Sequence, residues 1–115
     1  MSDSSVLSKL IETGKSAIDS SSVALNEISQ KIWENPELGF EETHAHATLT
    51  SFFEKEGFEV SKKTPMETAF IAKYGHEDGV KVGVMCEYDS LPGIGHACGH
   101  NLIAEAGAAA AIGEM

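Results

Sequence analysis

The chain has 115 residues, the usual size of one domain, and 42% of them are hydrophobic, so it can build a core. Its formal net charge of -10 argues against nucleic acid as a partner, because a phosphate backbone would be repelled, and gives no sign of attachment to an anionic membrane. No apolar stretch reaches the roughly 18 residues that a membrane span needs, and the N-terminus lacks the basic and apolar regions of a signal peptide. We therefore expect a cytoplasmic protein with no membrane or nucleic-acid partner.

Two helices are predicted in the first third of the chain. Residues 1–21 carry Val6, Leu7, Leu10 and Ile11 at helical spacing and are expected to form an N-terminal helical extension. The serines at 20–22 supply a break and an N-cap for a stronger helix over 22–34. Pro36 ends this second helix, because the residue before a proline is disfavoured in helical geometry.

A third helix is predicted over residues 41–55, with two glutamates in its first turn, where the helix dipole favours negative charge. Leu49, Phe52 and Phe53 should face the core, and Gly57 should end the helix in the left-handed conformation. A short strand over 58–61 and a loop over 62–68 follow.

Two further strands are expected, over residues 69–74 and 80–87, and the Gly-bounded turn between them suits a hairpin. The second is apolar on both faces, as in a central strand covered by helices, and Gly83 suggests close approach of a neighbouring element. A helix over 101–112 completes the pattern. We predict an α/β fold with residues 22–115 forming the segment of one catalytic domain.

The residues best suited to chemistry are His96, Cys98 and His100, which follow the strand predicted over 80–87. In an extended segment, side chains two positions apart point the same way, and thiolate and imidazole both suit zinc. The alternative is a Gly-rich turn whose His and Cys cap the next helix. Two cysteines are too few for a disulfide scaffold, and Cys86 is expected in the core.

Glu87 and Asp89 end the predicted strand and point toward the same loop. Either carboxylate could bind a metal or orient a ligating imidazole, and the alternative is a solvated strand end. The other histidines, His44, His46 and His76, lie on helix faces or in a turn and are expected to be structural.

Three blocks carry a resemblance to a known family: residues 35–42 (NPELGFEE), 87–92 (EYDSLP) and 96–101 (HACGHN). In this order they resemble the two-metal aminoacylase and carboxypeptidase family (metallopeptidase family M-twenty). Within it they look like the amidohydrolase branch, which includes auxin-conjugate and aminobenzoyl-glutamate hydrolases, and most like the cytosolic β-alanyl-lysine dipeptidase type, which is aminoacylase-like. The resemblance covers roughly residues 22–113.

The resemblance implies a three-layer αβα zinc-peptidase catalytic domain and metal-dependent hydrolysis of an amide in a dipeptide or N-acyl amino acid. Cys98 and His100 match the first two metal ligands of the branch. Asp89 falls where the family has the aspartate that orients a metal histidine, and Glu87 falls where the wider family has that histidine, so Glu87 is not expected to be a ligand. Many branch members carry aspartate at the position of Asn101.

The same resemblance implies two divalent metal ions, with zinc or manganese expected, and a homo-oligomeric complete enzyme. The general-base glutamate of the family has no counterpart in these residues, so the chain is expected to be the first segment of such an enzyme and inactive alone. The alternative is a truncated, non-catalytic product that binds a metal or a partner weakly.

Overall fold

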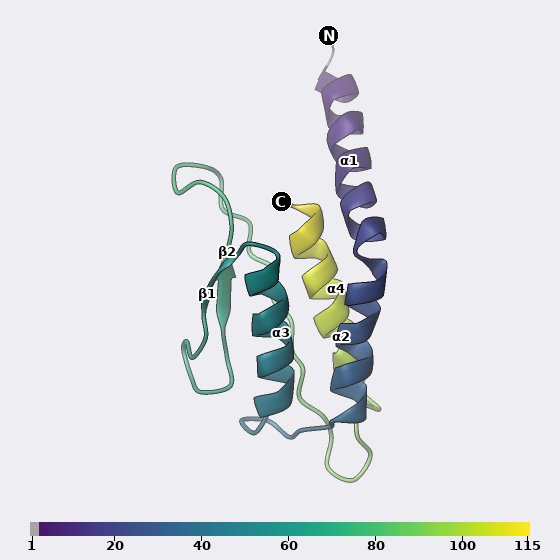
Figure 1. Cartoon of the computed structure of the whole chain (residues 1–115), viewed down its shortest axis with the longest axis vertical. Helices are drawn as coiled ribbons and strands as arrows, with labels where there is room; N and C mark the ends of the chain where they lie inside the picture. Colours follow the sequence, from purple (N-terminus) through teal and green to yellow (C-terminus); the bar gives the residue numbers. More distant parts are fainter. Residues whose placement is uncertain (1–2) are drawn as a thin grey trace.

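The computed structural model describes residues 3–115, which form four α-helices and two short β-strands. In chain order these are α1 (Asp3–Ser20), α2 (Ser22–Glu34), α3 (Thr43–Lys55), β1 (Glu59–Ser61), β2 (Ile71–Lys73) and α4 (His100–Gly113). In Figure 1, α1 and α2 follow one another as a long rod, and α4 runs back beside them. The small sheet lies beyond α3, on the side away from α2.

The helical core is formed by α2, α3 and α4, and small residues let α4 approach its neighbours closely. The fully buried side chains on α4 include Ala104 and Ala108, and those on α3 include Ala45 and Leu49. The face that α2 buries has helical spacing and consists of Leu25, Ile28, Ser29 and Ile32. These residues follow the predicted apolar stripe, so burial of that stripe accounts for the helix over 22–34.

The helix α1 packs against the end of α4 only through its second half. Ala17 and Ile18 contact the core, whereas Leu7 and Leu10 are exposed. At the crossing point a β-carbon added to Gly14 would lie 2.9 Å from the Gly113 carbonyl oxygen. Glycine is therefore the residue that lets these two helices meet so closely.

The hairpin of β1 and β2 is antiparallel, with Val60 opposite Ala72. It packs on α3 through an aromatic cluster in which the ring centroid of Phe53 lies 5.0 Å from that of Phe58 and 5.8 Å from that of Phe70. Such pairs add about 0.5–1.5 kcal/mol each beyond the burial of area. The cluster therefore holds the hairpin to the helix.

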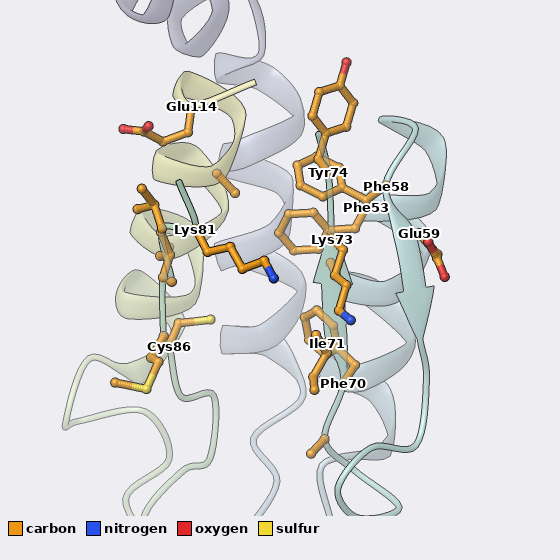
Figure 2. Close-up of a pocket in the computed structure, with 18 of the residues that line it drawn as sticks. Phe53, Phe58, Glu59, Phe70, Ile71, Lys73, Tyr74, Lys81, Cys86 and Glu114 are labelled. Atoms are coloured by element: carbon orange, nitrogen blue, oxygen red, sulfur yellow. The ribbon is translucent and has the colours of Figure 1, made fainter. Parts of the chain in front are cut away.

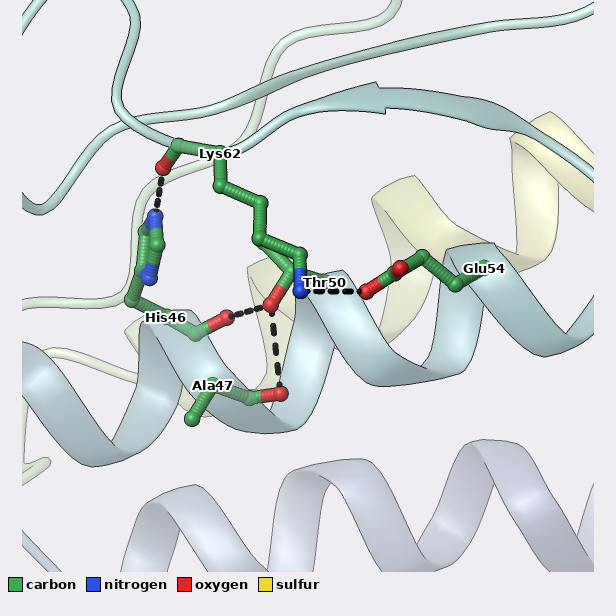
Figure 3. Close-up of polar contacts among 5 residues, drawn as sticks. All are labelled: His46, Ala47, Thr50, Glu54 and Lys62. Atoms are coloured by element: carbon green, nitrogen blue, oxygen red, sulfur yellow. Dashed lines mark hydrogen bonds and ion pairs between the residues drawn. The ribbon is translucent and has the colours of Figure 1, made fainter.

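Polar contacts reinforce the same junction along its edge (Figure 3). Lys62 pairs with Glu54 at 2.9 Å, and the His46 ring nitrogen Nε2 contacts the carbonyl oxygens of Lys62 and, at 3.1 Å, Ala69. The Thr50 hydroxyl donates back to the His46 carbonyl at 2.8 Å. His46 thus connects α3 to both ends of the loop that joins the two strands.

The strand predicted over 80–87 is wrong, and so is the hairpin predicted between it and residues 69–74. Residues 79–90 contain no strand, and β2 pairs with β1 instead. Val80 and Met85 are 96% and 93% exposed. A strand needs a hydrogen-bonded neighbour, and no described residue lies beside this segment to provide one.

Gly83 was expected to meet a neighbouring element, but nothing lies within 4 Å of a β-carbon placed there. The close approach occurs at Gly107 of α4, where a β-carbon would lie 2.9 Å from the Cys86 β-carbon and 3.8 Å from Val84. The segment over 84–86 therefore rests directly on α4.

The other predicted elements are confirmed with small shifts of their ends. The third helix begins at Thr43 rather than at residue 41, and the last begins at His100. The arrangement is a mixture of helices with a small sheet, compatible with an α/β fold. None of the described helices combines the length and apolar character needed to cross a membrane. The division at residue 21 stays a prediction.

We expect Gly107→Val to destabilise the fold, because its side chain would collide with Cys86. Overpacking of this kind costs about 1–3 kcal/mol. Urea unfolding followed by circular dichroism measures the change. The matched control is Gly83→Val, which has open space around it and should change stability by less than about 0.5 kcal/mol. Equal effects of the two substitutions would contradict the close packing of this segment on α4.

Candidate functional site

The three sequence blocks that carry the family resemblance come together at one end of the molecule. In Figure 1 this is the lower end, where α2 finishes and both α3 and α4 begin. The loop between α2 and α3 contains residues 35–42, and the turns over 91–98 lead into α4. Residues as far apart in the sequence as Glu37 and Ser90 therefore build one site.

Glu37 is the residue that joins these segments. Its carboxylate accepts hydrogen bonds from the Thr43 hydroxyl at 3.1 Å, the His44 amide at 2.9 Å and the Ala45 amide at 2.8 Å. Its own carbonyl oxygen accepts the Ser90 amide at 2.7 Å. Glu37 therefore caps the free amides at the start of α3 and anchors the second block at the same time.

The turns that follow Ser90 are closed by short backbone hydrogen bonds. The Leu91 amide donates to the Gly95 carbonyl at 2.9 Å, and Gly93 and Gly95 have φ of 76° and 61°. Glycine suits these positive φ values because it has no β-carbon. Gly95 also faces Pro36, which lies 3.8 Å from the place of a β-carbon. The turn is thus shaped to fit against the first block.

Asp89 and His100 form the best-ordered polar pair in this site. The Asp89 carboxylate oxygen Oδ1 lies 2.8 Å from His100 Nδ1, and the Cys98 thiol makes a long contact of 3.9 Å to the Asp89 carbonyl oxygen. A carboxylate on Nδ1 fixes the imidazole orientation and leaves Nε2 available. His100 is the first residue of α4, where the helix dipole also favours the negative charge of Asp89.

His96 does not join this group, so the expectation that three alternating side chains share one direction is wrong. Residues 96–98 form a turn, with the Gly99 amide bonded to the His96 carbonyl at 2.9 Å. His96 is 3% exposed, whereas Cys98 is exposed. Alternation holds for extended backbone, and a turn rotates successive side chains away from it.

The His96 imidazole is buried without a hydrogen-bond partner among the described residues. Burial lowers the pKa of His96 from its ordinary value of 6.5, and the neighbouring His100 lowers it further. The Ile32 backbone and the carboxylates of Asp89 and Glu37 oppose this shift. Among these influences burial is the largest, because it disfavours the charged form.

Asn101 is also buried, directly after His100. Its side-chain amide donates to the Ser29 carbonyl at 3.5 Å, and its Oδ1 has no partner among the described residues. The contact crosses from α4 to α2 at the level of the site. Asn101 therefore belongs to the packing behind Asp89 and His100, on the side away from solvent.

A second polar chain holds the segment that leads into Asp89. The buried Tyr88 hydroxyl donates to the Thr68 carbonyl, and the Thr68 hydroxyl donates to Glu42 at 3.1 Å. Burial raises the pKa of Tyr88 to about 12, and Glu42 and Cys86 add to the shift. Burial, with a contribution from Glu87, likewise raises the pKa of the Cys86 thiol. Both groups are therefore neutral near pH 7.

The remaining sequence-predicted residues lie outside the site. Glu87 is exposed and makes no hydrogen bond within the described chain, which agrees with the expectation that it is not a ligand. His44 and His76 are exposed. Sequence reasoning missed the capping role of Glu37. The available signal was a helix start at 43 with no Ser, Thr, Asp or Asn directly before it to act as a cap.

The donors present are compatible with part of a metal site. The Cys98 thiolate and the Nε2 of His100 are soft and borderline ligands that suit zinc, and the Asp89–His100 contact is the usual support for a ligating imidazole. Within residues 3–115, however, no group of three or more His, Cys, Asp or Glu side chains is placed to hold a metal ion together. The chain thus presents two candidate ligands and the carboxylate that orients one of them.

Comparisons with known proteins fit this picture. No protein-family model matches the chain. Over 109 residues it is 47% identical to a human Xaa-Arg dipeptidase (Homo sapiens), and over 106 residues it is 44% identical to the mouse protein of that name (Mus musculus). Over 114 residues it is 34% identical to a p-aminobenzoyl-glutamate hydrolase from Escherichia coli. Each match covers 84% of this chain.

These relatives define the class of protein as peptidases and related hydrolases. The chain belongs to the peptidase and amidohydrolase family of aminoacylases and carboxypeptidases, as its three sequence blocks predicted. It spans about a quarter of the length of the curated relatives it matches, at 25% of both dipeptidases and 24% of the bacterial hydrolase.

The buried His96 predicts a specific pH dependence of stability. Because its folded pKa lies below 6.5, the unfolded chain binds a proton as the pH falls through that value and the folded chain does not. Stability from neutral His96 is therefore complete above about pH 6.5 and is lost below it, by up to about 1.4 kcal/mol per pH unit.

Urea unfolding at about pH 7.5 and 5.5 measures this loss, with the two pH values chosen to bracket the ordinary pKa. His96→Gln should lose less stability than the parent chain between the two values. The exposed His44→Gln is the control and should behave like the parent. An identical pH dependence in His96→Gln and the parent would contradict the neutral, buried state of His96.

Proposed function

We propose that this chain supplies the first metal-binding half of an enzyme that hydrolyses an amide bond in a dipeptide or a related N-acyl amino acid. The observation that carries the proposal is the contact of Asp89 with His100 beside Cys98, at the meeting point of the three family blocks. The relatives named dipeptidase and hydrolase give the reaction class. The three-layer zinc-peptidase domain implied by the resemblance is part of the same proposal.

The roles of the chain's own residues follow from their positions. Cys98 and His100 would hold a divalent ion, which when bound polarises a carbonyl and acidifies water. Asp89 keeps the His100 ring in one orientation and tautomer, with Nδ1 bonded and Nε2 directed away. Glu37 and Ser90 hold the backbone around Asp89, so that the pair does not depend on a mobile loop.

Zinc, manganese and cobalt all suit such ligands, and we propose zinc because a thiolate favours it over manganese. A second ion and the general base would come from groups beyond this half-site. The substrate would be peptide-like, as the names of the relatives indicate. We further propose that the complete enzyme is an oligomer located in the cytoplasm.

Zinc binding tests the ligand assignment. The chain should bind zinc only weakly, because two protein donors do not complete a tetrahedral site. Titration against a chromophoric zinc chelator should show the affinity reduced at least about tenfold by Cys98→Ala and by His100→Ala. Asp89→Asn should reduce it about tenfold or more through loss of ring orientation. His76→Ala, in an exposed loop, is the control, and an equal loss there would contradict the assignment.

Catalysis is tested on the longest polypeptide that the gene encodes, loaded with zinc or manganese, against a panel of dipeptides and N-acyl amino acids. We expect hydrolysis of at least one member and a fall of 100-fold or more, on the order of 3 kcal/mol in barrier, for Cys98→Ala. The 115-residue chain alone should show no turnover above its own Cys98→Ala variant. Full activity without Cys98 would overturn the proposed mechanism.

A further inference from the structure

The largest cavity in the described part of the chain lies away from the candidate metal ligands. It has a volume of about 1250 Å³ and opens between the hairpin on α3 and the segment over 80–87 on α4. Figure 2 shows its two walls, with Phe70, Ile71 and Tyr74 on one side and Lys81 and Cys86 on the other. We refer to it below as the strand cleft.

The walls of the strand cleft are apolar but solvent-exposed. Val82 and Met85 are 69% and 93% exposed, and Ile71 on the opposite wall is 42% exposed. Exposed apolar residues concentrated in one cleft mark a binding surface, whereas scattered ones need no explanation. The strand cleft is therefore suited to an apolar occupant.

The backbone of both walls is also unpaired. β2 uses only one edge, toward β1. Within the described chain, residues 80–87 make no backbone hydrogen bond. Backbone amides and carbonyls that are removed from water must find partners. A strand inserted here would meet an unpaired edge on each side, which is how a peptide is added to an exposed sheet edge.

The charges in the strand cleft favour an occupant with a carboxylate. Lys73 and Lys81 extend into it from opposite walls (Figure 2), and neither makes an ion pair within residues 3–115. An acidic side chain between them would pair with one or both ammonium groups. The final residues, Glu114 and Met115, line the same cleft, so polypeptide joined to α4 would have a direct path into it.

We propose that the strand cleft binds one extended strand that pairs with β2 on one side and with residues 80–87 on the other. The occupant is the polypeptide that directly follows the matched quarter in the longer relatives. Its side chains alternate between apolar residues, which fill the cleft, and polar residues that include a carboxylate for Lys73 or Lys81. The proposal does not depend on the hydrolase activity proposed above.

The test uses the 115-residue chain and labelled peptides of about 12 residues, long enough for a strand of ordinary length. The peptides tile the region that follows the matched segment of the human Xaa-Arg dipeptidase. Fluorescence anisotropy should identify one peptide or two overlapping peptides that bind, while scrambled versions do not. Amide hydrogen exchange of residues 80–87 should slow at least about tenfold in the complex, because their backbone becomes paired.

Three variants sharpen the assignment. Val82→Asp and Lys73→Glu should each weaken peptide binding about tenfold or more, since they alter the cleft wall and its charge. Lys55→Glu lies outside the cleft and should leave binding unchanged. A peptide with N-methyl groups on alternate residues should lose binding, because the methyl groups block backbone pairing along one edge.

Several results would overturn the proposal. Absence of binding by every peptide, or equal binding of scrambled and native peptides, would exclude this occupant. Unchanged binding of the N-methylated peptide would exclude strand pairing. Sedimentation that shows a dimer dissociated by Val82→Asp, together with no peptide binding, would assign the strand cleft to a second copy of the chain.

Discussion

The hydrogen bonds of Glu37 are the constraint on which the rest of the site depends. One carboxylate satisfies two amides and a hydroxyl at the start of α3, and the carbonyl of the same residue holds the Ser90 amide. A helix start has unsatisfied amides, and a cap is worth about 1 kcal/mol. Glu37 thereby links the entry of α3 to the loop that carries Asp89. The loop position and the helix start become one structural feature.

The candidate metal site is a consequence of that link. Ser90 is fixed by Glu37, so its neighbour Asp89 has a defined position against the first residue of α4. Behind it, Asn101 and His96 are buried between α2 and α4 and exclude water from one side of the pair. Cys98 remains on the open side. The arrangement gives two candidate ligands facing outward from a rigid base, as a functional site requires.

The same packing explains why the molecule has a small sheet and a large cleft. Aromatic side chains hold the hairpin on α3, and Gly107 lets the segment over 84–86 rest on α4. The two sheet-forming regions are therefore attached to different helices. Between them lies the strand cleft, with apolar walls and unpaired backbone. The hairpin and the apolar segment each have the chemistry of a strand, but a sheet forms only where backbones lie side by side.

Local sequence determined the helices, because their apolar spacing, the proline at 36 and the glycine at 57 act within a few residues. It also determined the order of the three blocks, and so the family and the candidate ligands Cys98 and His100. It did not determine the strand over 80–87, since strand pairing depends on a neighbour elsewhere in the chain. Nor did it reveal that His96 turns inward or that Glu37 caps α3. Those positions are decided by contacts between segments far apart in sequence, which exist only once α2, α3 and α4 have packed together.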